Sequence, residues 1–233
     1  ETLKTKGVEK MIFERDEGGF FKKVITVHPF SSKTQSFTLN DCHKVYEIGF
    51  DLIPGSERFG FLRCVQYPVH FFRILWSAVW LINKYHVNII RATDPYWTGL
   101  FGYICSKITN IPFCVSIHAD YKKIMELNKN MRLLSILGSY KPAQYLARFI
   151  LSKANRVMPI RETLALNAVA NGVTAEKIRV IPHGIDLTVF NAPPSNNIQQ
   201  LFNIDPTLKI ISFVGRLSKE NYLDDILEIG RKL

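Results

Sequence analysis

Cysteine is scarce in this sequence, and none of it falls into a metal-binding or redox pattern. The four cysteines, Cys42, Cys64, Cys105 and Cys114, include no CxxC pair and no metal-ligand spacing. Cys105 and Cys114 lie within apolar runs, where a reduced thiol buried in the core is expected. Since disulfides are typical of secreted domains, this cysteine usage predicts a cytoplasmic protein.

Long apolar runs are lacking as well. No stretch reaches the ~20 consecutive apolar residues that a transmembrane helix requires. The closest, VHFFRILWSAVWLI at residues 69–82, contains an arginine and predicts a core or surface helix. A signal peptide and low-complexity segments are also missing. The opening ETLKTKGVEK reads as the end of a helix, so we expect the natural chain to begin earlier.

Acidic residues are outnumbered. Asp and Glu total 20 against 30 Lys and Arg, which gives a net charge of +10. Such a balance favours acidic partners, namely phosphates, nucleic acid or an anionic membrane face, and says nothing about fold. The sequence has no basic–aromatic interleaving and no nucleic-acid-binding motif, so we expect no nucleic-acid partner. Hydrophobic residues make up 47% of the chain, enough for a substantial core.

Short β-branched runs alternate with helical spacings along the chain. Strands are predicted at residues 23–28, 87–92, 113–118, 156–159, 178–181 and 209–214, with short strands near 44–48. Helices are predicted at residues 69–85, 95–109, 142–153, 162–171 and from about 223. Apolar strands separated by helices indicate an α/β fold with a doubly wound, Rossmann-like parallel sheet.

A Pro- and Asn-rich segment divides the sequence near its end. Residues 191–207, NAPPSNNIQQLFNIDPT, predict a linker. We therefore expect an N-terminal Rossmann-like domain over residues 1–190 and the start of a second, truncated one over residues 208–233.

Polar residues gather after the predicted strands. In doubly wound sheets, ligands bind beyond the carboxyl ends of the strands. Five of the six ends carry a histidine or arginine within a residue or two, whereas the opposite ends carry ordinary turn residues. The polar residues of interest at these ends are His28, Asp94, His118, Asp120, Arg161, His183, Gly184, Asp186, Gly215 and Arg216. This asymmetry predicts a basic cleft suited to a phosphorylated ligand.

Several of these residues also have a purely structural explanation. Asp94 followed by Pro95 is a good helix N-cap pair. Arg161 fits a solvated helix start, and His28 fits a solvent-facing position. His118 ends a buried strand and opens a long loop, so a mechanistic and a structural role are equally compatible with its place.

Two motifs in fixed order resemble a known family. GVTAEKIRVIPHGIDLTVF at residues 172–190, followed by IISFVGRLSKENYLDDIL at residues 210–227, is similar to the retaining family-4 glycosyltransferases of the GT-B fold. The similarity is close over residues 152–227. The strand–helix–strand–histidine pattern of residues 87–120 also fits, and residues 20–86 fit loosely.

The resemblance implies two Rossmann-like domains with the active site between them. The C-terminal domain would hold a UDP- or GDP-linked sugar and the N-terminal domain the acceptor, with no metal and no further cofactor. By position, Arg216 matches the arginine that stabilises the departing diphosphate, with Gly215 and Lys219 on its loop. His118 matches the histidine that reaches the donor sugar. The remaining candidates line the acceptor side of the cleft: Asp94, Asp120, Arg161, His183, Gly184 and Asp186.

The sequence departs from the family pattern at several points. The family lysine should fall at Asn221, so Lys219 is the expected substitute, and His183 stands where asparagine is usual. The C-terminal pair of glutamates and the first strand with its Gly-rich loop are not found. We therefore expect this stretch alone to be inactive.

The expected function is transfer of a sugar, with retention, to a polysaccharide or lipid-linked acceptor of the cell envelope. Six basic residues would suit an anionic membrane, such as the inner face of the cytoplasmic membrane, although a scattered solvated surface explains them equally: Arg58, Arg63, Arg73, Lys141, Arg148 and Lys153. Other interpretations are a GT-B nucleotide-sugar epimerase or phosphorylase, or a non-catalytic carbohydrate- or anion-binding module. A phosphorylase would carry a cofactor lysine in its C-terminal half.

Overall fold

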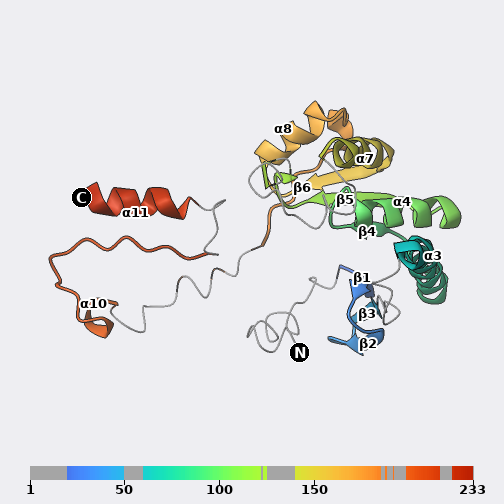
Figure 1. The fold of residues 1–233 in the computed structure, drawn as a ribbon, viewed down its shortest axis with the longest axis horizontal. Coiled ribbons are helices and arrows are strands. Elements are labelled where there is room, and N and C mark those ends of the chain that lie inside the picture. Colours follow the sequence, from blue (N-terminus) through green and yellow to red (C-terminus); the bar gives the residue numbers. More distant parts are fainter. Residues whose placement is uncertain are drawn as a thin grey trace. The chain divides into compact units, whose positions relative to one another are not determined.

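The computed structural model describes residues 20–49, 60–121, 123–124, 140–184, 187, 191, 198–215 and 222–232 (Figure 1). Their side chains are described too, except those of residues 60–65 and 140. The chain divides into two units, Glu1–Asn88 with Ile104–Ile111, and Ile89–Tyr103 with Pro112–Leu233. Each is considered by itself.

The first unit contains a small mixed sheet. Its strands β1 (Val24–Ser31), β2 (Gln35–Thr38) and β3 (His43–Gly49) lie in the order β1-β3-β2. β1 and β3 are parallel, as expected for this fold class, whereas β2 pairs with β3 in the antiparallel sense. The turn into β3 is held by Asn40, whose side-chain oxygen accepts hydrogen bonds from the backbone N–H groups of Cys42 at 3.1 Å and His43 at 2.8 Å.

A long helix, α3 (Gly60–Tyr85), packs on this sheet. The phenol oxygens of Tyr46 on β3 and Tyr85 on α3 lie 2.5 Å apart, and Ile74 and Leu81 are buried. The predicted helix at residues 69–85 is therefore correct, and it begins earlier than expected. Pro68 lies inside the helix, where it removes one backbone hydrogen bond.

The second unit contains the parallel sheet that the sequence predicted. Strands β4 (Ile90–Ala92), β5 (Phe113–Ile117) and β6 (Arg156–Pro159) are all parallel, in the order β4-β5-β6. The helices that follow these strands are α4 (Trp97–Thr109), α7 (Tyr140–Lys153) and α8 (Glu162–Ala170). Every residue of β5 is buried, so this strand is covered on both faces, as its unbroken apolar sequence indicated.

The core of this unit forms where the sheet meets α7 and α8. Phe113, Val115 and Val157 from the strands are buried together with Ile150 of α7 and Leu164 of α8. Cys105 and Cys114 are buried free thiols, as predicted. Burial raises the pKa of Cys105 to about 11 and raises that of Cys114 as well.

The predicted strand at residues 178–181 forms only in part. After the short helix η2 (Ala175–Lys177), the chain runs parallel to β6, and the N–H groups of Arg179 and Ile181 donate to the carbonyls of Val157 and Pro159. A single bridge, Val157 to Ile178, results. The ladder stops at Pro182, because proline has no N–H to continue it.

The predicted strand at residues 209–214 does not form. A strand needs a neighbour for its backbone hydrogen bonds, and none of the described strands pairs with this segment. Its side chains are largely exposed, Val214 to 97%. Two helices flank this segment in sequence, α10 (Ile198–Leu201) and α11 (Leu223–Lys232), and the second begins where it was expected.

None of the described helices, α3 included, has the length and hydropathy that a bilayer crossing requires.

Candidate functional site

Five of the predicted polar residues lie at one edge of the second unit's sheet, whereas His28 lies within β1 of the first unit. Because β4, β5 and β6 are parallel, their carboxyl ends meet at the same edge. Asp94 follows β4, His118 and Asp120 follow β5, and Arg161 follows β6. The partial strand that runs alongside β6 brings His183 to the same edge.

His118 and His183 lie face to face, although 65 residues separate them. Their ring centroids are 5.2 Å apart with an angle of 8° between the planes, so the rings are stacked. Nδ1 of His118 lies 3.4 Å from Nε2 of His183. A ring N–H points within the plane of its own ring, so stacking describes this contact better than a hydrogen bond does. The contact brings the two histidines together at this edge, and their role in a site stays a prediction.

The surroundings of His118 favour its neutral form. Burial lowers the pKa of His118 most, and the positive charges of Arg91 and His183 lower it further, while the carboxylate of Asp94 acts in the opposite direction. A neutral imidazole presents one donor nitrogen and one acceptor nitrogen. His118 can therefore both give and accept a hydrogen bond near neutral pH.

Arg91 belongs to this edge, although the sequence analysis did not single it out. Its Nε donates to the buried Ser116 Oγ on β5 at 2.7 Å, which holds the guanidinium beside the next strand. The signal in the sequence was its position within the last residues of β4. Its pairing with Ser116 depends on the strand register and could not be predicted from the sequence.

Asp94 caps the helix that follows it. Its Oδ1 accepts a hydrogen bond from the Tyr96 N–H at 2.8 Å, and its Oδ2 accepts one from the Thr98 hydroxyl at 2.8 Å. The N–H of Asp94 in turn donates to the Thr98 oxygen at 3.1 Å. The capping role, one of the two interpretations open from the sequence, is the one that these contacts support.

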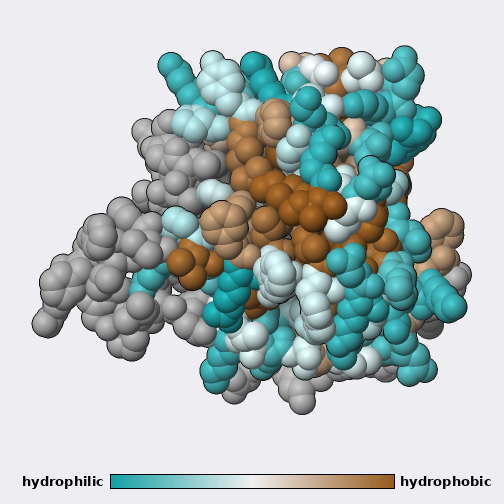
Figure 2. All heavy atoms as spheres, turned by 90° about the vertical axis from the view of Figure 1, so that its right-hand side faces the viewer, coloured by the Kyte–Doolittle hydropathy of each residue, from teal (hydrophilic) through white to brown (hydrophobic). Residues whose placement is uncertain are grey.

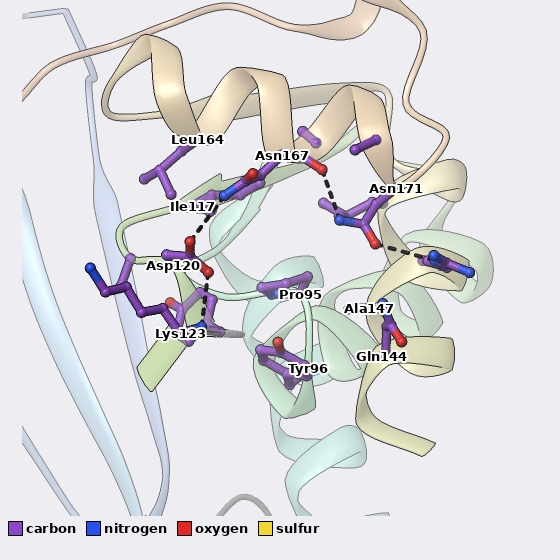
Figure 3. A pocket seen from close by; sticks show the side chains of 16 residues that line it. Pro95, Tyr96, Ile117, Asp120, Lys123, Gln144, Ala147, Leu164, Asn167 and Asn171 are labelled. Atoms are coloured by element: carbon purple, nitrogen blue, oxygen red, sulfur yellow. Dashed lines mark hydrogen bonds between the residues drawn. The ribbon is translucent and has the colours of Figure 1, made fainter. Parts of the chain in front are cut away.

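Asp120 also has two partners. The backbone N–H of Lys123 donates to its Oδ1 at 3.1 Å, and the side-chain amide of Asn167 donates to its Oδ2 at 3.2 Å. The second contact joins the loop after β5 to α8. Figure 3 shows both bonds at the edge of a pocket.

This pocket has a volume of about 620 Å³ and lies between the start of α4, the loop after β5, and helices α7 and α8. Apolar side chains such as Leu151 and Leu164 form part of its wall, and Lys123, Gln144 and Arg148 supply polar groups. Arg148 is held by a hydrogen bond from its Nε to Asn171 Oδ1 at 3.2 Å. The sequence analysis missed this pocket, because residues spaced three and four apart on a helix are read as core.

Tyr121 lies in the wall of the same pocket and makes an edge-to-face contact with Tyr96 at 5.2 Å between ring centroids. Burial, with a smaller contribution from the charge of Asp94, raises the pKa of Tyr121 to about 12. Its phenol therefore stays protonated and can donate a hydrogen bond.

Other predicted site residues are exposed or lie outside the described residues. Arg161 is exposed, and at the N-terminus of α8 its side chain makes no capping hydrogen bond. Gly184 is exposed with open space where a Cβ would stand, so no described neighbour requires glycine there. Gly215 is exposed at the end of a described segment. Asp186, Arg216 and Lys219 lie outside the described residues, so their roles stay predictions.

Within the described part of the chain, no group of three or more His, Cys, Asp or Glu side chains is arranged to hold a metal ion. The expectation of metal-free, cofactor-free chemistry stays a prediction.

One sequence family and two solved structures are similar to this chain. The sequence profile of Glycosyltransferase Family 4 matches residues 23–189. Sucrose-phosphate synthase from Thermosynechococcus elongatus aligns with a TM-score of 0.53 at 14% identity, covering 78% of this chain and 42% of that one. Anabaena Alr3699/HepE in complex with UDP-glucose aligns with a TM-score of 0.42 at 19% identity, covering 56% of this chain and 31% of that one. No curated protein sequence matches significantly.

The alignment to the synthase confirms the predicted fold class. The chain spans about a third to two fifths of the length of the two structures. At such low identity, the alignment to the synthase shows the fold alone, an α/β architecture of the GT-B glycosyltransferase type with a parallel sheet. The profile, by contrast, matches well over half of the sequence. On that match, the chain belongs to glycosyltransferase family 4.

Proposed function

We propose that this chain supplies the acceptor-side domain of a glycosyltransferase. The reaction moves a sugar from a nucleotide-diphosphate sugar, UDP- or GDP-linked, to a polysaccharide or lipid-linked acceptor. The observation that carries the proposal is the pair His118 and His183, stacked at the carboxyl edge of the parallel sheet, with His118 held neutral. Family membership supports the reaction class.

In this proposal, His118 acts by hydrogen bonding. Transfer with retention breaks the bond from the anomeric carbon to the diphosphate oxygen and forms a bond to the acceptor oxygen on the same face. A neutral imidazole can donate to a sugar hydroxyl while accepting from another group. Burial lowers the pKa of His118 most and so favours that state, and the charge of Arg91, fixed by Ser116, adds to the effect.

The charge that develops on the leaving diphosphate needs cations. We assign this task to Arg216, assisted by Lys219 and the backbone at Gly215, by their positions in the family motif. A guanidinium placed where negative charge develops lowers the barrier more than it strengthens substrate binding.

We place the acceptor at the pocket beside Asp120, because its lining includes Ile117 and Ala119, the residues on either side of His118. Its apolar wall can hold the face of a sugar ring or part of a lipid chain. Asn167, Gln144 and Arg148 offer donors for hydroxyl or phosphate oxygens. A lipid-linked acceptor would also require the protein to work at a membrane surface.

Contact with an anionic membrane, from the cytoplasmic side, is therefore part of the proposal. Lys141, Arg148 and Lys153 are exposed on α7 in the second unit, and Arg73 is exposed on α3 in the first. The side chains of Arg58 and Arg63 lie outside the described residues.

The test is a donor panel. The intact protein is incubated with UDP- and GDP-linked sugars, with and without glycan and lipid-linked acceptors, and nucleotide release and product configuration are measured. We expect one donor to be consumed and the product to keep the donor's configuration. Conversion of the donor into an isomer without an acceptor would indicate an epimerase, and the absence of both turnover and nucleotide binding would refute the proposal.

The His118→Ala variant links activity to the site. By analogy with the loss of an oxyanion-stabilising donor, we expect turnover to fall roughly 10²–10³-fold. His28→Ala is the matched control, because His28 is an exposed histidine in the other unit. It lies within β1, which continues three residues beyond the predicted strand end. Arg216→Ala should produce a loss of similar size. Equal activities of the two histidine variants would remove His118 from the mechanism.

A further inference from the structure

Helix α3 carries apolar side chains on two separate faces. One face packs within the first unit, where His70, Ile74 and Leu81 are buried. The other face carries large side chains that are open to solvent. Their exposed fractions are 62% for Val69, 66% for Phe72, 79% for Trp76 and 50% for Trp80.

These four exposed residues form one continuous stripe, the α3 stripe. They follow one another at intervals of three or four, which places them on the same side of a helix. From Val69 to Trp80 the stripe is roughly 16 Å long at 1.5 Å per residue. The α3 stripe is defined by these exposed fractions; Figure 2 shows one face of the molecule, on which hydrophobic side chains lie open among hydrophilic ones. Aligned, exposed aromatic side chains mark an interaction surface rather than ordinary surface composition.

Cations border the α3 stripe, and the helix carries no acidic residue. The Lys84 Nζ lies 4.3 Å from the centroid of the Trp80 ring. Arg73 is exposed next to Phe72 and donates a hydrogen bond to Thr34 Oγ1 at 2.6 Å, which holds its side chain near the stripe. The surface that fits α3 is therefore apolar with a negatively charged border.

We propose that the α3 stripe docks this protein on an anionic lipid bilayer, with the helix lying in the plane of the interface. Trp and Phe suit the boundary between headgroups and acyl chains, and flanking Lys and Arg are attracted to anionic headgroups. The proposal assigns a surface to the membrane contact suggested above, but it does not depend on sugar transfer.

Charge favours a bilayer over a second copy of this chain. Two copies facing each other through the α3 stripe would bring Arg73 and Lys84 of one toward those of the other, with no acidic residue on α3 to compensate. An anionic bilayer supplies the complementary charge for both cations.

The tryptophans provide a direct reporter of this contact. The chain has three, of which Trp76 and Trp80 belong to the α3 stripe and Trp97 lies in α4. The variant Trp97→Phe therefore leaves emission from the stripe alone. With vesicles of phosphatidylcholine and phosphatidylglycerol in equal parts, we expect its emission to shift to shorter wavelength and to be quenched by brominated acyl chains. Pure phosphatidylcholine vesicles should give a much weaker response.

A pair of double variants then tests the stripe itself. Phe72→Ser with Trp76→Ser should weaken co-sedimentation with the mixed vesicles at least about tenfold, the lower bound for removing one buried aromatic side chain. Leu166→Ser with Val169→Ser is the matched control, because both residues are exposed on α8, to 69% and 49%. Circular dichroism checks that both double variants fold. The control should bind like the parent chain.

The other outcomes overturn the proposal. Equal losses in the two double variants would refute the assignment to α3, and equal binding to both kinds of vesicle would refute the anionic preference. Absence of vesicle binding, with a dimer in sedimentation velocity that only the α3 double variant loses, would assign the stripe to a second copy. Transfer to a soluble acceptor, measured separately, reports on the proposed function and not on α3.

Discussion

At the scale of single residues, the site depends on a histidine that stays neutral. Burial, the charge of Arg91 and the electrostatic interaction with His183 together outweigh the nearby Asp94 carboxylate in setting the pKa of His118. The consequence is a side chain whose charge differs between the folded and unfolded states over a range of pH. Stability and hydrogen-bonding capacity at the site are therefore linked to the same proton.

The pKa of His118 should be measurably low. We expect its ring signals in NMR to titrate below the ordinary histidine value of 6.5. The pKa of His118 is lower in the folded chain than in the unfolded chain. At a pH between these two values, the unfolded chain binds one more proton than the folded chain, so unfolding is favoured as the pH falls. The stability that His118 contributes is fully present above pH 6.5 and is lost as the pH drops through the window beneath it.

The matched variant is His118→Asn, which cannot titrate. Its urea midpoint should depend less on pH in that window than the midpoint of the parent chain. A His118 pKa at or above 6.5 would contradict the described surroundings of the ring.

Gly102 is a second residue whose role the packing explains. A Cβ at this position of α4 would stand 2.5 Å from Cε2 of Phe113, which is only 1% exposed. We expect Gly102→Ala to destabilise the chain by about 1–3 kcal/mol through overpacking, although alanine is the better helix former. Gly230→Ala on α11, where a Cβ meets open space, should instead be neutral or stabilising by up to about 1 kcal/mol. Urea denaturation measures the free energy of unfolding of both variants. Equal changes in the two would mean that the Phe113 ring moves aside to accommodate the new methyl group.

At the scale of secondary-structure elements, the sequence predicted well what is determined locally. The bounds of β6 were correct, and those of α8 were correct to within a residue, because apolar runs and a closing Asn171-Gly172 turn specify them. β2 (Gln35–Thr38) was missed, since it has no apolar run and exists by pairing with β3. The segment at residues 209–214 was wrongly predicted as a strand. Its β-branched sequence suits a strand, but none of the described strands pairs with it.

In the candidate site too, the sequence predicted some features, whereas others depend on contacts between distant segments. The rule that ligands bind at strand ends predicted His118, His183 and Asp120 as members of one edge, because topology alone places them there. The stacking of the two histidines, the bond from Arg91 to Ser116 and the pocket between α7 and α8 depend on register and helix packing. A single sequence does not specify these features.

The packing of α8 can be tested with two leucines on the same helix. Leu164 is 1% exposed in the core, and Leu166 is 69% exposed. Leu164→Ala should lower the free energy of unfolding by about 2–5 kcal/mol, because it removes buried methyl groups and leaves a cavity. Leu166→Ala should change it by no more than about 0.5 kcal/mol. Similar losses in the two variants, measured by urea denaturation, would mean that α8 does not pack through its Leu164 face.

At the scale of the whole molecule, charge and apolar contact act over different distances. The net charge of +10 attracts an anionic surface over about a Debye length, ~10 Å at 0.1 M salt, before any side chain makes contact. The α3 stripe acts only on contact, by removing apolar area from water. If both the charge attraction and the apolar contact contribute to membrane binding, their contributions can be distinguished by how each responds to salt.

We therefore expect vesicle binding by the parent chain to weaken steadily as sodium chloride is raised, because salt screens attraction between exposed charges. The Phe72→Ser, Trp76→Ser double variant keeps every cation, so its binding should weaken by the same factor from a lower starting value. Lys84→Gln should instead reduce the salt dependence while leaving the α3 stripe intact. Co-sedimentation with the mixed phosphatidylcholine and phosphatidylglycerol vesicles over a salt series measures the binding of all three proteins.

Salt-independent binding of the parent chain would show that apolar contact alone holds the protein on the bilayer. A steeper salt dependence in the double variant would show that the two terms are coupled, as when headgroup contacts form only after the aromatic side chains insert.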